Sequence, residues 1–312
     1  MRQNPRVTKL LHEGREGKRL AYATVAKDAE AMRYRKDKGE LIEPMPNGFI
    51  EAARWKELNP VEQLSMMIRT VHAKHPDRVF AATSAALIRG WWVPWEAVDG
   101  HVHCASKRHG VSRGDAIVWH HYDPALAVRV KRCLVTDSVR TLIDCALTVP
   151  FVHALAIYDS AAREGINLAE VTSACATMRI DPAPVLRLVR HANPLSENGG
   201  ESWVRATIID MGYAEPQLQV TFHDAQTGRT YRVDFLWVLP DGTIVVLEYD
   251  GLEKYTSETM KDGVPTAQRA GDERERDAAL ERCGVARIAH VFHGQVADRA
   301  QLTRVLQRLG VP

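Results

Sequence analysis

Hydrophobic residues in this chain follow two different periods, and stretches dominated by one or the other alternate along the sequence. Residues 1–52 hold short apolar clusters at helical spacing, and then two strand-like runs on either side of Asn47-Gly48. From Phe80 to Leu195, strand-like runs alternate with segments whose apolar residues recur every three or four positions. This alternation predicts a multi-domain α/β protein.

Breaks in the pattern predict the domain boundaries. The helices of residues 1–52 end in a predicted two-stranded wing, which is typical of a winged helix-turn-helix. A second break lies at 180–198, where Pro182, Pro184 and Asn193-Pro194 interrupt the helical spacing. The sequence therefore predicts a winged helix-turn-helix over 1–52, an α/β domain over 53–195 and a third domain over 196–312.

Two apolar runs in the third domain form the most informative stretch. Residues 233–239 and 244–249 have the composition of buried strands. They are joined by Pro240-Asp241-Gly242, in which proline fixes φ and glycine accepts a positive φ. We therefore predict a β-hairpin here.

Three carboxylates, Asp234, Glu248 and Asp250, interrupt these otherwise apolar strands. Burying a carboxylate is costly unless it is paired or holds a cation. Pairing across the turn brings Asp234 near Glu248, and Glu248 and Asp250 share a face because they are two positions apart. Because converging oxygen ligands suit Mg²⁺ or Mn²⁺, we predict these three residues as metal ligands.

Two further candidates flank the hairpin. Glu201 stands at the start of a helix predicted to begin near Ser202, at the same end of the sheet. Lys254 follows the second strand, where a cation could stabilise a phosphate or position a water. Taken singly, each acidic residue is also explained as a solvated or salt-bridged carboxylate; the joint order favours a site. The predicted catalytic residues are Glu201, Asp234, Glu248, Asp250 and Lys254.

Two groups of basic residues are candidates for DNA contacts. One is the run Arg33, Arg35, Lys36 and Lys38, which follows the predicted helix before the wing. In a winged helix-turn-helix such cations contact phosphates, while the preceding helix reaches base edges. The alternative is a solvated helix face. The other group, Arg274 and Arg276, lies on a predicted helix over 272–283 and suits phosphate contact or pairing with Asp277 and Glu281.

Histidines in the middle domain raise the question of a second metal site. His101 and His103 alternate on a predicted strand and could bind zinc together, and His120-His121 lies on another strand. A third ligand with clear spacing is missing, so structural or surface histidines are the favoured interpretation.

Composition narrows the classes of function. The chain has 312 residues, a net charge of +2 and a pI near 8.3, so any nucleic-acid surface must come from local clustering of cations. Five scattered cysteines without a Cys-x-x-Cys pair favour reduced thiols over a disulfide framework or a zinc site. No signal core or membrane-spanning run is present in the sequence, and no Walker or Rossmann glycine loop. We expect a cytoplasmic protein with no membrane partner.

Residues 196–312 resemble the very-short-patch-repair-like endonuclease domains of the PD-(D/E)XK superfamily. The matching pieces are Gly200-Glu-Ser202, the strand Gln217 to Val220, Val233-Asp-Phe235, Leu247-Glu-Tyr-Asp-Gly251 with Lys254, and Asp272-Glu-Arg-Glu-Arg-Asp277 leading to Leu280 and Gly284. The resemblance implies a restriction-endonuclease-like α/β core with a mixed sheet. It also implies a metal held by Asp234 and Glu248, with support from Glu201. In one respect the chain departs from the superfamily, since Asp250 stands where its usual lysine lies, and Lys254 is the candidate replacement.

Residues 1–195 resemble AbiEi-like antitoxins and regulators. The resemblance rests on Lys38-Gly-Glu-Leu-Ile-Glu43 with Asn47-Gly-Phe-Ile50, and on Thr136-Asp-Ser-Val-Arg-Thr-Leu-Ile-Asp144 with Tyr158-Asp-Ser-Ala161. It implies a DNA-binding winged helix followed by a central domain for scaffolding or partner contact. A homodimer and a toxin partner both remain open.

These observations lead to one main hypothesis and two alternatives. The main hypothesis is a Mg²⁺- or Mn²⁺-dependent DNA endonuclease, acting in DNA repair, phage defence or a mobile-element context. The first alternative is a catalytically inactive DNA-binding regulator of the type IV antitoxin kind, which Asp250 favours. The second is an interaction scaffold that never touches DNA.

Overall fold

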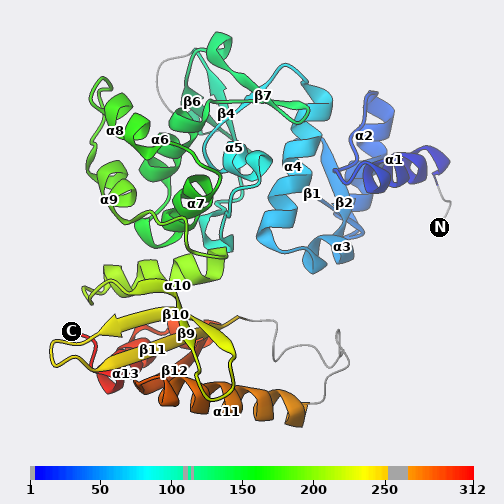
Figure 1. The fold of residues 1–312 in the computed structure, drawn as a ribbon. Helices are drawn as coiled ribbons and strands as arrows, with labels where there is room; N and C mark the ends of the chain where they lie inside the picture. Colours follow the sequence, from blue (N-terminus) through cyan, green and yellow to red (C-terminus); the bar gives the residue numbers. More distant parts are fainter. Residues whose placement is uncertain (1–3, 108–111, 114–115, 252–265) are drawn as a thin grey trace. The chain divides into compact units, whose positions relative to one another are not determined.

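The protein is an α/β protein that divides into two compact units, Met1–Ala192 and Asn193–Pro312 (Figure 1). The computed structural model describes residues 4–107, 112–113, 116–251 and 266–312. The division falls at Asn193-Pro194, where the sequence pattern breaks, and each unit has its own hydrophobic core.

The N-terminal unit begins with helices, continues with strands that follow one another from β4 to β8, and ends with helices. In order they are α1 (Pro5–Glu16), α2 (Ala26–Asp37), β1 (Leu41–Met45), β2 (Gly48–Glu51), α3 (Ala52–Glu57), α4 (Pro60–Lys74), β3 (Val79–Phe80), α5 (Ala82–Arg89), β4 (Val102–Ser106), β5 (Ser112–Arg113), β6 (Ile117–His121), β7 (Val128–Val130), β8 (Cys133–Val135), α6 (Ser138–Thr148), α7 (Phe151–Arg163), α8 (Leu168–Cys175) and α9 (Ala183–His191), with 3-10 turns at Trp95–Ala97 and Pro124–Leu126.

Strands of the described N-terminal residues form two sheets. β1 and β2 make an antiparallel hairpin, and the others form a mixed sheet in the order β5-β6-β4-β3-β8-β7. Helix α4 begins with a capping box between Asn59 and Glu62, with Pro60 in its first turn. One hydrophobic cluster joins Leu20 and Met45 to buried side chains of α4. The hairpin and the α1–α2 connection therefore share a core with the sheet that follows, whereas α1 and α2 pack on the hairpin in a cluster of their own.

The C-terminal unit contains the predicted hairpin. Its elements are α10 (Gly199–Asp210), β9 (Gln217–His223), β10 (Thr230–Val238), β11 (Ile244–Asp250), α11 (Thr266–Arg282), β12 (Val285–Phe292), α12 (His293–Ala297) and α13 (Arg299–Leu309). Within the described residues its strands form one mixed sheet in the order β12-β11-β10-β9. β10 pairs antiparallel with both β9 and β11, and β12 runs parallel to β11.

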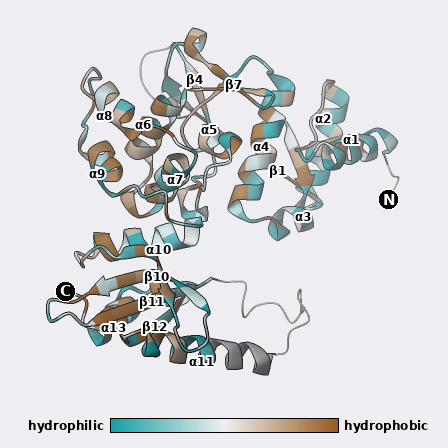
Figure 2. Ribbon diagram, viewed as in Figure 1, coloured by the Kyte–Doolittle hydropathy of each residue, from teal (hydrophilic) through white to brown (hydrophobic). Residues whose placement is uncertain are grey.

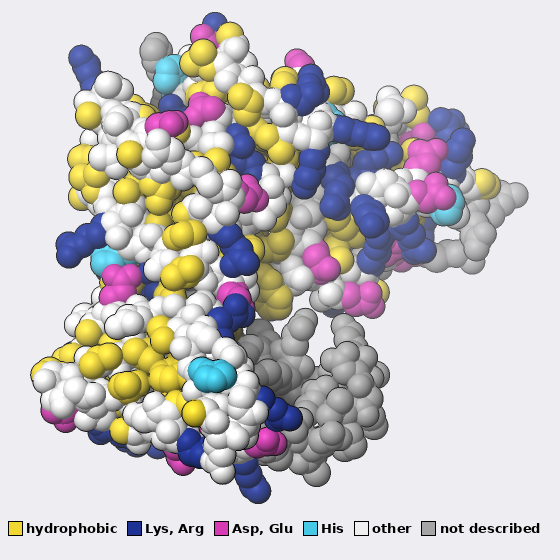
Figure 3. All heavy atoms as spheres, in the orientation of Figure 1, with side chains coloured by type: hydrophobic (Ala, Val, Ile, Leu, Met, Phe, Trp, Pro, Cys, Tyr) yellow, Lys and Arg dark blue, Asp and Glu magenta, His cyan; other side chains and the backbone are white. Residues whose placement is uncertain are grey.

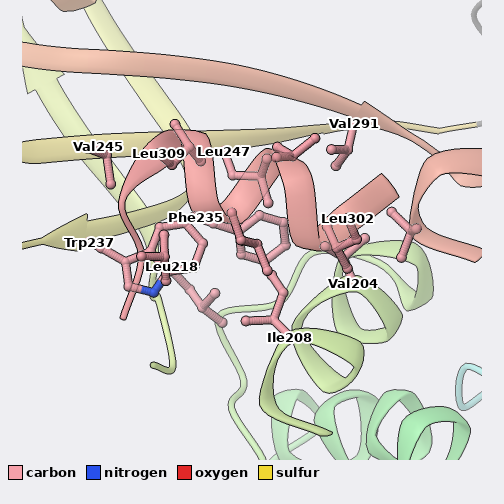
Figure 4. Close-up of a cluster of buried hydrophobic side chains, with 14 of the residues drawn as sticks. Val204, Ile208, Leu218, Phe235, Trp237, Val245, Leu247, Val291, Leu302 and Leu309 are labelled. Atoms are coloured by element: carbon pink, nitrogen blue, oxygen red, sulfur yellow. The ribbon is translucent and has the colours of Figure 1, made fainter. Parts of the chain in front are cut away.

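Both faces of this sheet are buried. One face packs on α10 and α13 through a cluster that includes Phe235, Leu247 and Leu302 (Figure 4). The other face packs on α11, where Leu236 and Val246 meet Leu280. Figure 2 shows hydrophobic residues along much of β10 and β11. Strands covered on both sides carry continuous apolar runs, which explains the sequence of 233–239 and 244–249.

Gly200, in the first turn of α10, lets that helix approach β11. A Cβ at this position would lie 2.5 Å from Cε1 of Tyr249. We expect Gly200→Ala to destabilise the C-terminal unit by about 1–3 kcal/mol, because the Tyr249 ring or the helix must move. The measurement is calorimetric thermal unfolding of the full-length protein.

The matched control is Gly294→Ala, in α12 of the same unit. A Cβ there has no neighbour within 4 Å, so this change should be neutral or slightly stabilising. Equal effects of the two substitutions would contradict the proposed close approach.

Candidate active site

Glu201 is held at the start of α10 by the residues around it. Asn198 caps the helix, and its Oδ1 accepts hydrogen bonds from the backbone N–H groups of Gly200 (2.9 Å) and Glu201 (3.0 Å). The Glu201 carboxylate in turn accepts from Nδ2 of Asn198 (2.7 Å) and from the Glu197 N–H (2.8 Å). Its side chain is buried at the helix N-terminus, where a negative charge is favoured.

Asp234 and Glu248 meet on adjacent strands. The antiparallel register places Phe235 opposite Leu247, so Asp234 and Glu248 lie opposite each other at the adjoining position. The Asp234 N–H lies 3.4 Å from Oε2 of Glu248, and the Tyr249 N–H donates to Oδ2 of Asp234 at 3.0 Å. The structure thus brings together the two acidic residues that the sequence placed on opposite strands of the hairpin.

The strands change face at this point. Leu218 and Phe235 pack in the cluster beneath α10 and α13, whereas Val220 and Val233 pack in the cluster beneath α11. Residues two apart on a regular strand share a face, so the alternation is broken on both strands between these positions. Gln219, which lies between Leu218 and Val220, has a φ of 55°. This left-handed conformation is costly for a residue with a side chain and is frequent at functional sites.

The side chain of Gln219 links two of the carboxylates. Its Nε2 donates to Oε2 of Glu201 at 3.0 Å and lies 3.5 Å from Oδ1 of Asp234. This residue was not predicted from the sequence. The available signal was a polar residue between two apolar ones on a strand, which is too common to single it out.

Arg276 lies in the acidic site. Its Nη2 donates to Oε1 of Glu248 and to the carbonyl oxygen of Arg232, each at 2.5 Å. The sequence predicted this residue for phosphate contact or for a pair within its own helix; in the structure its partner is a carboxylate on β11. Arg274, the other predicted DNA contact of this helix, is exposed.

Asp250 contacts a histidine of the neighbouring strand β12. Its Oδ2 is 3.1 Å from Nδ1 of His290, and Nε2 of the same ring is 3.4 Å from Oδ2 of Asp277. His290 was not predicted, because β12 reaches the site only through its parallel pairing with β11. Lys254, the remaining predicted catalytic residue, lies outside the residues that the structure describes.

Burial and mutual repulsion shape the electrostatics of the site. Burial, and then the nearby charge of Asp234, raise the pKa of Glu201 to about 7. The same two causes raise the pKa of Glu248 to about 7, although Arg276 acts in the opposite direction. Each carboxylate therefore binds a proton more readily than in water, and a cation would relieve the same repulsion.

The hydrogen bonds divide the oxygens of Asp234 and Glu248 into two classes. One oxygen of each is fixed by a close donor, namely Oδ2 by the Tyr249 N–H and Oε1 by Arg276. For the other two, Oδ1 and Oε2, the nearest donors among the described residues lie at 3.5 Å and 3.4 Å. Mg²⁺ is commonly held by one or two carboxylates together with water, so this donor set fits Mg²⁺ or Mn²⁺.

In the described part of the chain, no three His, Cys, Asp or Glu side chains are arranged to hold one metal ion. The predicted ligand Asp250 is engaged with His290 at 3.1 Å. Asp234 and Glu248 are accordingly the residues that would hold a cation here.

The basic run before the wing lies on and just after α2. Arg35 pairs with Glu40 and Lys36 with Glu43, both at 2.7 Å. Lys38 lies over the ring of Tyr34, while Arg33 is exposed. Two of the four predicted phosphate contacts are thus already paired with carboxylates.

The middle-domain histidines pair across two strands. His103 on β4 contacts His120 on the parallel strand β6, with Nδ1 and Nε2 2.8 Å apart, and both rings are buried. Burial, and then His103, lower the pKa of His120 to about 3. His101 instead contacts Asp99 at the surface. These contacts agree with structural histidines rather than a pair of zinc ligands on one strand.

Comparison of the chain with protein-family models, with curated proteins and with solved structures finds no match. None of the helices in the described residues combines the length and the apolar character needed to cross a bilayer.

Replacing Asp234 by asparagine tests whether the acidic cluster is strained. Burial, and then the charge of Asp234, raise the pKa of Glu201 and Glu248, so the folded state binds more protons than the unfolded state between about pH 4.5 and pH 7. Stability is therefore lost as the pH rises through this window. We expect Asp234→Asn to stabilise the C-terminal unit at pH 8 by about 1 kcal/mol, and much less at pH 5.

The measurement is thermal unfolding at both pH values, with and without Mg²⁺. The cation should stabilise the wild type and leave the variant unchanged, since it binds the folded site only. A variant that is less stable than the wild type at pH 8 without cation would show that Asp234 is a structural residue.

Proposed function

We propose that the C-terminal unit is a metal-dependent nuclease that hydrolyses phosphodiester bonds of DNA. The observation that carries this proposal is the pair of buried carboxylates, Asp234 and Glu248. Adjacent strands bring the two carboxylates together. In each of them a close donor fixes one oxygen, and the second oxygen has only a longer contact within the described residues. The likeness of 196–312 to the PD-(D/E)XK superfamily supports the same conclusion.

Each residue of the site has a proposed task. Asp234 and Glu248 would hold Mg²⁺ or Mn²⁺, which would supply an activated water and positive charge next to the phosphate. Gln219 and Glu201 keep Asp234 in place from the neighbouring strand and helix. Arg276 fixes the orientation of the Glu248 carboxylate, as residues that contact metal ligands do elsewhere.

The N-terminal unit has the proposed task of binding DNA. Its two helices and antiparallel hairpin are in the order expected of a winged helix-turn-helix. Arg33 and Lys38, which form no ion pair within the described residues, are better placed for phosphate contact than the paired Arg35 and Lys36.

A catalytically inactive regulator is the second candidate. Asp250 stands where the superfamily has its lysine, and its carboxylate contacts His290. An acidic side chain at this position cannot supply the positive charge that a lysine would give to a phosphate. Under this function the C-terminal unit binds DNA without cutting it.

Cleavage of supercoiled plasmid separates the two candidates. We expect the full-length protein to nick DNA with Mg²⁺ or Mn²⁺ and not with EDTA. Asp234→Asn and Glu248→Gln should each lower the rate by more than about a hundredfold, because removal of a ligand has a larger effect than removal of a residue that only orients ligands.

Glu281→Gln, on the exposed surface of α11, is the charge-matched control and should cut as the wild type does. DNA binding without cleavage under either cation would support the regulator instead. Cleavage that survives both site substitutions would place the chemistry elsewhere in the chain.

A further inference from the structure

A second polar surface lies in the N-terminal unit, where cations alternate with aromatic rings. The guanidinium of Arg19 lies 4.7 Å from the centre of the Tyr22 ring, and Nζ of Lys74 lies 5.9 Å from the same ring. The guanidinium of Arg78 lies 4.9 Å from the centre of a Trp119 ring. We call these five residues the basic–aromatic surface. They come from the α1–α2 connection, the end of α4 with the turn after it, and β6.

A pocket of about 280 Å³ lies within this surface. The residues that line it include the cations Lys74 and Arg78 together with His75, Trp119 and Pro46. Pro46 belongs to the turn between β1 and β2, so the tip of the predicted wing borders the pocket. The wall of the pocket thus combines apolar and aromatic side chains with cationic ones.

The cations of this surface have no carboxylate partners among the residues that the structure describes. Lys74 donates instead to the Pro46 carbonyl at 3.3 Å, and Arg19 donates to the Leu20 carbonyl at 3.0 Å. Burial, and then Arg78, lower the pKa of Lys74. The pKa of His75 is lowered by burial and by the same repulsion from Arg78 and Lys74, and Asp77 opposes it with a smaller effect.

Crowded like charges are unfavourable in the free protein and favour an anionic ligand. Figure 3 shows that Lys and Arg side chains are frequent on the face of this unit that it draws. Cations alone would suit any phosphate. Tyr22 and the stacked pair of Arg78 with Trp119 add flat surfaces, and unpaired bases stack on aromatic rings and on guanidinium planes.

We propose that the basic–aromatic surface binds an unpaired strand of DNA. Lys74 and Arg19 contact its phosphates, and one base stacks on the Arg78 and Trp119 pair at the pocket. In a duplex the bases are stacked on one another and cannot stack on these rings, so the surface favours single-stranded DNA. This binding does not depend on the proposed nuclease activity, because its residues all lie in the N-terminal unit.

Binding of a fluorescently labelled oligo-dT to the full-length protein, in EDTA so that no cleavage intervenes, tests the proposal. Fluorescence anisotropy gives the affinity over a range of salt concentrations, for the single strand and for a duplex of the same length. The double substitution Lys74→Ala with Arg78→Ala should weaken single-strand binding by about tenfold or more. It should also reduce the salt slope, which is the slope of the logarithm of the affinity against the logarithm of the salt concentration, by about 0.7 for each phosphate that the variant no longer neutralises.

Arg78→Lys separates stacking from charge. This change keeps the positive charge and removes the planar guanidinium on which a base could stack. We therefore expect an unchanged salt slope and binding that is weaker by at least about fivefold. Trp119→Phe, which keeps an aromatic ring, should bind nearly as the wild type does. Arg304→Ala, an exposed cation of the C-terminal unit, is the charge-matched control and should have no effect.

Three outcomes would overturn the proposal. They are an absence of salt-dependent binding to the oligonucleotide, an equal loss of binding in the Arg304 control, and tighter binding to the duplex than to the single strand with no effect of Arg78→Lys. The last outcome would assign the surface to duplex phosphates. Circular dichroism of each variant shows whether it has kept its fold.

Discussion

The pairing of β10 with β11 is the constraint on which the candidate active site depends. A slip of one residue would move every side chain of a strand to the opposite face. The turn that joins the two strands opposes such a slip, and so does the fit of particular side chains on each face: Phe235 and Leu247 pack beneath α10 and α13, while Leu236 and Val246 pack beneath α11. Two hydrophobic cores thus fix one register. The proximity of the two carboxylates that follow the Phe235–Leu247 pair is a consequence of that register rather than of any attraction between them.

The electrostatic repulsion within the site is therefore unfavourable for folding, whereas the packing that brings its residues together is favourable. Its carboxylates repel one another in a buried setting, and the surrounding donors offset only part of the cost: Asn198 and Gln219 act on Glu201, and Arg276 acts on Glu248. The left-handed backbone of Gln219 adds strain at the same place. An apolar residue at each position would pack at lower cost. The burial of several such costly groups at one point of a sheet distinguishes this cluster from acidic residues at ordinary strand ends.

Sequence alone predicted the parts of this arrangement that are local. The hairpin has a turn of recognisable chemistry, and Asp234 and Glu248 lie on its two strands, so their proximity follows from the turn. Gln219 and His290, and the pairing of Arg276 with Glu248, could not be found in this way. Their contacts depend on the strand order and on α11 lying over one face, which no short-range pattern specifies. The same reason explains the histidines of the middle domain: alternation puts His101 and His103 together, but the partner of His103 is on the neighbouring parallel strand.

The two units carry opposite local charges, although the chain as a whole has a net charge of only +2. A phosphate near Asp234 and Glu248 is repelled until a cation is bound, so under the proposed function the C-terminal unit contributes little affinity for DNA on its own. Affinity then has to come from cations elsewhere, and Lys74 and Arg78 are free of acidic partners within the described residues. Salt would act mainly on the N-terminal unit and divalent cations on the C-terminal unit. Binding and chemistry are thereby separated into two responses that can be measured independently.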